Sequence, residues 1–285
     1  MRAVTTAPSR SFDLYGPAVP DSPVVVSVPH AGRDYPRELV EALRVPLPAL
    51  LPLEDRHVDA IGLAARRGET MIVARRPRAW IDLNRSERER DPLVDDGASP
   101  LATPQPSIKL RSGLGLVPRR VATAGDLWRG RFAGEAIDRR IAEDHRPYHA
   151  ALATALAAAR DRFGTAILID LHSMPTLGAG EPQIVLGDRF GRAAVDSIVA
   201  AAEAAVRRHC LTTARNAPYA GGHILERQGD PAGGIHAIQV EIDRLLYLDP
   251  LTLEPGAGAR AIAAMLRSMI DALADLILPT AAAAE

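Results

Sequence analysis

The chain has one cysteine and one lysine in 285 residues. A lone cysteine, Cys210, excludes a disulfide bond within the chain and a zinc site built from several cysteines. Lys109 is the lone lysine, so arginine carries the other positive charges, and the arginine-rich segment 75–78 is expected to be a solvated face. The formal net charge of −1 gives no basic excess of the kind that binds nucleic acid or an anionic membrane. The sequence therefore predicts neither as a partner.

Long apolar runs and several catalytic motifs are also missing. No run reaches the ~20 apolar residues of a membrane-spanning helix, and residues 1–16 lack the apolar segment of a signal peptide, so a cytoplasmic location is expected. The G-x-S-x-G elbow, the G-x-x-x-x-G-K-[ST] loop and the H-E-x-x-H helix do not occur. These absences exclude a serine nucleophile elbow, a P-loop nucleotide site and a helix-borne zinc site of the H-E-x-x-H type.

Strand-like and helix-like segments alternate along the chain. This alternation predicts one α/β domain over residues 1–285, a three-layer sandwich with a mixed, mostly parallel central sheet flanked by helices. Residues 1–20 are expected to form a loose leader, and residues 86–130, rich in charge and then in Gly, Pro and Ser, a substrate loop. The predicted strands are 24–28, 71–74, 79–83, 166–171 and 237–242, and the predicted helices are 36–43, 58–65, 134–163, 193–208 and 259–278.

Two of the predicted strands each end on a histidine. VSVPHAGR delivers His30 and AILIDLHSMP delivers His172. Ligands of open α/β sheets bind beyond the carboxyl ends of the strands, and a neutral imidazole held there is a good zinc ligand. Asp170 shares the strand face of His172 and would orient it, while Pro29 and Gly32 would aim His30 and leave room for a ligand. The alternative, two hydrogen-bonded histidines at loop edges, is equally compatible with the sequence.

A catalytic zinc needs a third protein ligand and an open position. The best candidates are Glu54 and Asp55 in PLEDRHVD. Because this segment precedes an apolar helix, both carboxylates could instead stabilise the N-terminus of that helix. The residues themselves do not decide between the two.

Three further segments carry side chains suited to a substrate. In IDLNRSE, Asn84 and Arg85 offer donors for a carboxylate, although Arg85 could equally pair with a neighbouring acidic residue. In GIHAIQVEIDR, Glu241 lies in a core-like strand, where a carboxylate is costly unless it is paired or functional; beside a metal it would act as general base and then general acid. The alternative is an exposed sheet face. NAPYAGG contributes Tyr219 and two glycines that allow close approach of a ligand.

Eight segments, in this order, resemble the N-formylglutamate amidohydrolase family. They are VPHAG, LEDRHVD, IDLNR, RPYH, DLHSMP, VLGDR, NAPYAGG and HAIQVEIDRLLYLD, and they span residues 28–249. The resemblance implies a fold similar to zinc carboxypeptidases and aspartoacylases (carboxypeptidase/phosphorylase-hydrolase-like). It also implies a zinc-dependent amidohydrolase that cleaves a small N-formyl or N-acyl amino acid, such as N-formyl-L-glutamate, to formate and the free amino acid. Many members of the family act in histidine degradation.

The resemblance also implies roles for particular residues. His30 and His172 would bind zinc with Asp55, or with Glu54 as the alternative, and Glu241 would be the general acid and base. Asn84 and Arg85, helped by Arg146 or Arg129, would hold the carboxylates of the substrate. The sequence departs from the carboxypeptidase-like relatives at one point. Those relatives take a histidine and a glutamate from one H-x-x-E turn, whereas here the third residue after His30 is Arg33.

Two other functions remain open from the sequence. One is a zinc carboxypeptidase or amidase acting on a peptide or a cell-wall fragment, and the other is a non-catalytic α/β protein that binds a ligand in the same pocket. The sequence does not decide the oligomeric state.

Overall fold

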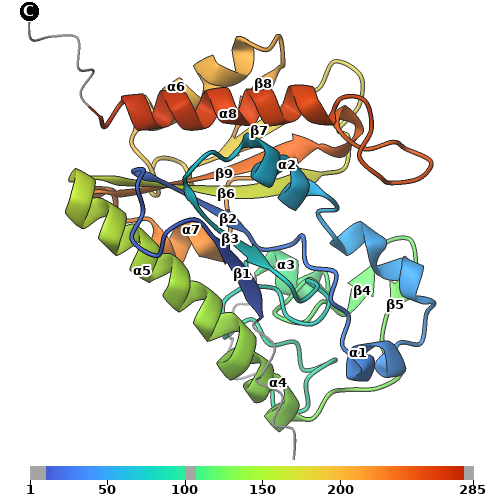
Figure 1. Ribbon diagram of the computed structural model, residues 1–285. Coiled ribbons are helices and arrows are strands. Elements are labelled where there is room, and N and C mark those ends of the chain that lie inside the picture. The colour runs from blue at the N-terminus through green and yellow to red at the C-terminus, as the bar shows by residue number, and fades with distance from the viewer. Residues whose placement is uncertain (1–10, 100–106, 279–285) are drawn as a thin grey trace, which may run out of the picture.

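The computed structural model describes residues 11–99 and 107–278, and a seven-stranded sheet forms its centre (Figure 1). Four neighbouring strands run parallel, β1 and β7 join them antiparallel, and β8 pairs parallel with β7. The predicted α/β class with a mixed, mostly parallel sheet between helices is confirmed. The strands in spatial order are β1 (Phe12–Tyr15), β3 (Thr70–Ala74), β2 (Val24–Val28), β6 (Ala166–Met174), β9 (Ile235–Asp243), β7 (Ile184–Gly187) and β8 (Thr213–Arg215). A separate ribbon pairs β4 (Arg120–Val121) with β5 (Gly125–Asp126).

Helices cover both faces of the sheet, which gives three layers (Figure 1). On one face lie α2 (Val58–Ala65), α6 (Asp196–Arg207) and α8 (Ala259–Asp275). On the other lie α5 (Arg146–Phe163) and α7 (His223–Gln228), and α4 (Gly134–Arg140) continues into α5 through the π-helical turn Ile141–His145. The short helices are α1 (Arg37–Ala42) and α3 (Ile108–Arg111), with 3-10 segments at Leu47–Leu53, Pro231–Gly233 and Arg244–Leu246. None of the helices in the described part of the chain is long and apolar enough to cross a membrane.

The two faces of the sheet differ in chemistry. Along β6, Ile167, Ile169 and Leu171 pack into the core under α2, α6 and α8. The alternate positions point to the opposite face, because side chains alternate along a strand. There the parallel register aligns Ser27 with Asp170 and Asp170 with Gln239. One step further along, His172 lies beside Glu241. The register therefore places a row of polar residues at the carboxyl end of the sheet on the α5 and α7 side.

Several predicted elements differ from the structure. Residues 79–83 do not form a strand. The Trp80 amide donates to the Pro77 carbonyl in a turn, and the Asp82 carboxylate and carbonyl accept the amides of Asn84 and Arg85. The bonds to Asp82 turn the chain there, and such short polar side chains compete with sheet pairing. Within the expected leader, residues 12–15 form the edge strand β1, while residues 1–10 lie outside the described range. The strands β7 and β8 were not predicted from the sequence. The long helix predicted over 134–163 is interrupted only in its hydrogen-bond pattern, at the π-helical turn.

Candidate active site

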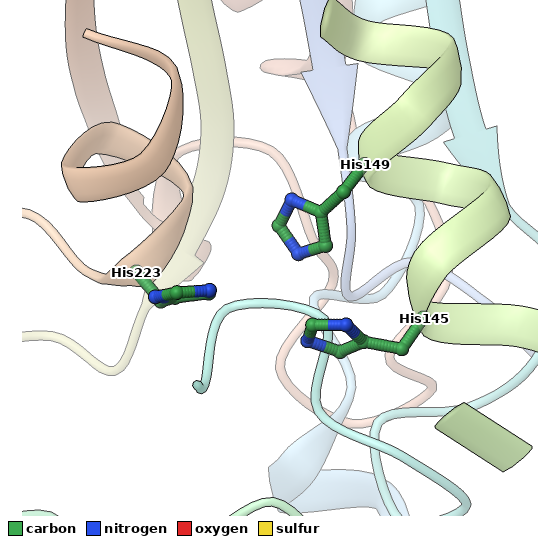
Figure 2. Close-up of side chains that lie close together, drawn as sticks. All are labelled: His145, His149 and His223. Atoms are coloured by element: carbon green, nitrogen blue, oxygen red, sulfur yellow. The ribbon is translucent and has the colours of Figure 1, made fainter. Parts of the chain in front are cut away.

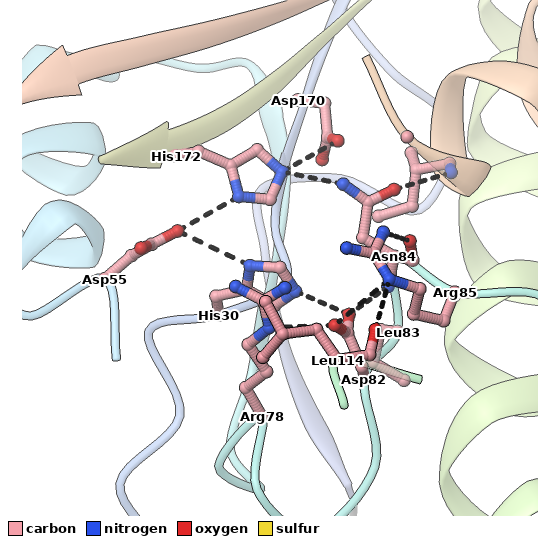
Figure 3. A network of polar contacts seen from close by, with 12 residues as sticks. His30, Asp55, Arg78, Asp82, Leu83, Asn84, Arg85, Leu114, Asp170 and His172 are labelled. Carbon is pink, nitrogen blue, oxygen red and sulfur yellow. Dashed lines mark hydrogen bonds and ion pairs between the residues drawn. The ribbon is translucent and has the colours of Figure 1, made fainter. Parts of the chain in front are cut away.

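His30, Asp55 and His172 converge at the carboxyl end of the sheet, and all three are buried (Figure 3). The Nδ1 atoms of both histidines face the same oxygen of Asp55, Oδ2, at 3.5 Å for His30 and 3.0 Å for His172. The backbone amide of Asp55 donates to the His30 carbonyl at 3.0 Å, which ties the two loops together. Two imidazoles and one carboxylate therefore lie close enough for their ligand atoms to share one ion.

A carboxylate holds the far nitrogen of each histidine. His30 Nε2 lies 2.8 Å from Asp82 Oδ1, and His172 Nε2 lies 2.9 Å from Asp170 Oδ2, as the spacing along the strand predicts for Asp170. Ser27 donates to the other oxygen of Asp170 at 2.8 Å. Carboxylates placed in this way fix the tautomer and the direction of metal-ligating imidazoles. The arrangement fits a divalent metal bound by Nδ1 of both histidines and by Asp55.

The protonation states of these groups are consistent with a cation site. Burial opposes ionisation of Asp55, but hydrogen bonds from His172 and His30 outweigh it and hold the pKa of Asp55 well below its usual range. Burial also disfavours a charged His172, yet Asp170 and Asp55 outweigh it and raise the pKa of His172 well above the usual value. Metal binding therefore has to displace a proton from His172, which makes the affinity fall at low pH.

The structure separates the two candidates for the third ligand. Asp55 faces both histidines, whereas the carboxylate of Glu54 accepts hydrogen bonds from Tyr35 and, at 2.9 Å, from Arg56 Nη1. The carboxylate of Glu54 is thus hydrogen-bonded to Tyr35 and Arg56 and not to the histidines.

Glu241 lies beside His172 and is buried. Its Oε1 accepts a hydrogen bond from Gln239 Nε2 at 2.8 Å. The side-chain oxygen Oε1 of Gln239 in turn accepts from Asn84 Nδ2 at 3.3 Å and from the Gly222 amide at 3.1 Å. Burial raises the pKa of Glu241 to about 7, against the opposing influence of His172. A carboxyl group with such a pKa can take up and release a proton near neutral pH.

A cavity of about 290 Å³ opens onto these groups. This volume is at the lower end of ligand pockets, which suits a molecule of amino-acid size. Besides the groups described above, its lining includes four cationic side chains and Tyr219, and Asp55 and Glu241 are its acidic members. The cavity therefore favours an anionic ligand. The cations are Arg78, Arg85, Lys109 and Arg244.

Three of these four cations were not identified from the sequence. Arg78 was expected on a solvated face, but its Nε donates to Asp82 Oδ2 at 2.8 Å and its side chain lines the cavity. Arg244 lies directly after β9 and donates from Nη2 to Asp55 Oδ1 at 2.9 Å. Lys109 lies 6.0 Å above the ring of Tyr219, and burial together with Arg85 lowers its pKa. The sequence offers two signals for Lys109: it is the lone lysine, and it lies in the predicted substrate loop 86–130.

Other predicted site residues lie elsewhere. Arg146 pairs with Glu87 at 2.8 Å and its side chain is 62% exposed, and Arg129 donates to the Leu43 carbonyl. Neither lines the cavity. Gly32 does not leave room for a ligand as expected, because a Cβ there would overlap the backbone of Arg76. Its missing side chain accommodates neighbouring protein instead.

Comparison with known proteins gives consistent matches. A profile of the N-formylglutamate amidohydrolase family matches residues 22–248. An N-formylglutamate deformylase of Pseudomonas putida is 33% identical over 245 residues, covering 80% of this chain and 82% of that protein. One from Pseudomonas aeruginosa is 29% identical over 269 residues, covering 88% and 92%. The crystal structure of an N-formylglutamate amidohydrolase from Ralstonia eutropha JMP134 matches with a TM-score of 0.85 and 33% identity, covering 94% of this chain and 98% of that one. The similarity extends over most of each chain.

Proposed function

Because the chain belongs to the N-formylglutamate amidohydrolase family, as its eight sequence segments predicted, we propose that it hydrolyses N-formyl-L-glutamate or a closely related N-acyl amino acid. The products are formate, or another acid, and the free amino acid. The observation that carries the proposal is the buried group His30, Asp55 and His172 beside Glu241, in a small cavity with an excess of cationic side chains.

We propose zinc as the metal of this site, bound by His30, Asp55 and His172. Nitrogen and oxygen donors in this combination, with both imidazoles oriented by carboxylates, suit zinc. When bound, the metal supplies Lewis acidity that lowers the pKa of water and polarises a carbonyl group.

The protein's own groups then move the proton and hold the substrate. Glu241 accepts the proton of the attacking water and returns it to the nitrogen of the leaving amine. Because Gln239 already donates to Glu241 Oε1, the other oxygen, Oε2, is the atom proposed to carry this proton. Arg85 uses Nε and Nη1 to bind the carbonyls of Leu114 and Asn84, so its Nη2 is proposed to bind a substrate carboxylate.

The segment 86–130 is proposed as the wall of the substrate site, because Lys109 and Leu114 from this segment line the cavity; its residues 100–106 lie outside the described part of the chain. Asn84 and Tyr219 are proposed as further substrate contacts. The small cavity favours an amino-acid derivative over the peptide or cell-wall fragment considered from the sequence. A role in histidine degradation is part of the same proposal, since the resemblance implies it, and the cytoplasmic location stays a prediction.

The test is release of formate from N-formyl-L-glutamate by zinc-loaded protein, compared with other N-formyl and N-acetyl amino acids. We expect Glu241→Gln to lower kcat by about 10²–10⁴-fold while the protein keeps its zinc. A non-catalytic binding protein would release no formate, and its ligand affinity would survive the substitution. Wild-type activity that is unchanged after removal of all metal would contradict the proposal.

A further inference from the structure

A second cluster of histidines lies behind the active site, on the helices that cover this face of the sheet (Figure 2). His145 is the last residue of the π-helical turn before α5, His149 lies in the first turn of α5, and His223 is the first residue of α7. Each offers a ring nitrogen within 4.8 Å of those of the other two. Together with the active-site pair, this cluster takes up five of the chain's eight histidines.

The orientation of the first two imidazoles is fixed by backbone carbonyls. His145 Nε2 lies 2.8 Å from the carbonyl oxygen of Arg85, and His149 Nε2 lies 2.9 Å from that of Leu83. Because a carbonyl can only accept, both Nε2 atoms carry the hydrogen and both Nδ1 atoms keep a lone pair. Metal-ligating histidines are held in place by contacts of this kind.

Several nitrogens of the cluster are buried and have no hydrogen-bond partner among the described residues, 11–99 and 107–278. They are Nδ1 of His145 and both ring nitrogens of His223. His145 is fully buried, and the nearest acidic atom to its Nδ1 is Glu87 Oε1 at 3.6 Å. The corresponding distance from His223 Nδ1 to Glu226 Oε2 is also 3.6 Å. Buried polar atoms in native proteins nearly always have a partner, so several orphans in one place require an explanation.

We propose that His145, His149 and His223 form a second metal site, separate from the active site, for a borderline transition-metal ion such as Zn²⁺ or Co²⁺. Three imidazoles suit these ions and do not suit Mg²⁺ or Ca²⁺, which prefer oxygen. Glu87 and Glu226 are the nearby carboxylates that can complete the coordination.

The charge state of the cluster agrees with this assignment. Burial lowers the pKa of all three histidines, that of His149 to about 2. Neighbouring histidines add to the effect at His145 and His149, whereas Glu226 opposes it at His223 without outweighing burial. The imidazoles are therefore neutral at physiological pH, which is the form that binds a metal. His149 has existing contacts on both nitrogens, to Leu83 and at 3.4 Å to Gln228, so binding costs it one of them. We expect this site to be weaker than the one at Asp55.

The cluster is hydrogen-bonded to the segment 83–85, so an ion bound there would affect the position of this segment. His145 and His149 bind the carbonyls on either side of Asn84, and the backbone amide of Ile224, next to His223, donates to Asn84 Oδ1 at 2.9 Å. An ion bound by all three histidines would hold the segment 83–85 in a fixed position against α5 and α7. This segment presents Asn84 and Arg85 to the cavity.

The test is the number of Zn²⁺ ions bound per chain after equilibrium dialysis of metal-free protein, with Zn²⁺ alone as the probe. We expect two ions for the wild type and one each for His223→Gln and His172→Asn. The control His209→Gln removes a histidine that lies outside both clusters and contacts Ser268, and it should keep two. Circular dichroism and thermal melting establish that each variant is folded.

The variant His172→Asn tests the proposal without changing the second cluster. In this background Co²⁺ should bind and give the absorption bands of a nitrogen-ligated ion, and a further His145→Gln substitution should abolish them. If His172→Asn binds no ion, or if His223→Gln binds as many as the wild type, the second site is refuted. If instead the wild type binds one ion, which His172→Asn keeps and His223→Gln loses, the proposed active-site metal fails while the second site stands.

Discussion

Asp55 joins the proposed metal site to the charges of the cavity. Its Oδ2 faces both histidines and its Oδ1 accepts from Arg244. We predict that Asp55→Asn lowers zinc affinity by more than about 100-fold, since loss of a ligand costs more than the 10–100-fold of an outer partner. Zinc content after dialysis against a competing chelator measures the effect, in a protein that also carries His223→Gln so that one site is observed.

The neighbouring Glu54 is the matched control for that substitution. It is equally buried, but its carboxylate binds Tyr35 and Arg56 instead of the histidines. Glu54→Gln should therefore keep the zinc affinity, with its effect confined to thermal stability. Loss of zinc from Glu54→Gln and not from Asp55→Asn would reverse the assignment of the third ligand.

The raised pKa of Glu241 predicts how the activity falls at acid pH. As general base it must be ionised, and burial raises its pKa to about 7. Activity should then decline as pH falls below the pKa, because a growing fraction of the carboxyl is protonated. A bound divalent cation favours the carboxylate, so we expect the acid limb of kcat/KM at or below pH 7. The residual activity of Glu241→Gln should lack this limb. A limb that persists unchanged in the variant would assign the titration to another group.

The sequence identified the residues whose position follows from strand register. His30, His172 and Glu241 end or lie in strands of one parallel sheet, so a single rule about carboxyl edges brings them together. Arg78 comes from a turn and Lys109 from the short helix α3, and no spacing in the sequence encodes that these two segments meet. Arg146 illustrates the converse, because the family motif implied a substrate role for an arginine that pairs with Glu87 on the surface and does not line the cavity.

At the scale of elements, the segment 83–85 and the loop before α7 fit closely against each other. A Cβ added at Gly222 would lie 2.6 Å from Asn84 Cγ, which is closer than any normal contact. We predict that Gly222→Ala shifts Asn84 and lowers kcat/KM by about 10²-fold, the order expected when a positioned group moves by ~1 Å. A formate-release assay measures this. Gly68→Ala is the control, since a Cβ there meets nothing within 4 Å. Equal activity of the two variants would show that Asn84 is not critical to catalysis.

The same segment explains where element prediction from the sequence failed. Residues 79–83 contain buried apolar side chains typical of a strand, and Ile81 and Leu83 are indeed in the core. The backbone nevertheless turns at both ends of this segment, where the Trp80 amide donates to the Pro77 carbonyl and the amides of Asn84 and Arg85 donate to Asp82. The strands of the central sheet that were missed, β1, β7 and β8, have four residues or fewer. Patterns this short carry too few residues to reveal a period.

At the scale of the whole molecule, one face of the sheet forms an apolar core and the other carries the candidate active site. The face under α2, α6 and α8 is an apolar core. On the opposite face the polar rows of β2, β6 and β9 interrupt the core near the carboxyl edge, where carboxylates and histidines are buried together. Buried ionisable groups lower stability unless they are paired or bind a metal. The active-site metal is therefore expected to stabilise the fold as well as to support catalysis.

This expectation can be measured by thermal unfolding. Zinc that binds only the folded chain, at about 100 times its Kd, stabilises it by about 2.7 kcal/mol. With about 2–4 °C per kcal/mol for a chain of this size class, the melting temperature should rise by about 5–10 °C. The experiment uses His223→Gln to leave the proposed second site out, and compares metal-free with zinc-loaded protein. The double variant Asp55→Asn/His223→Gln should show no such rise. A melting temperature of His223→Gln that does not respond to zinc would mean that the buried carboxylates and histidines are balanced by one another and not by a metal.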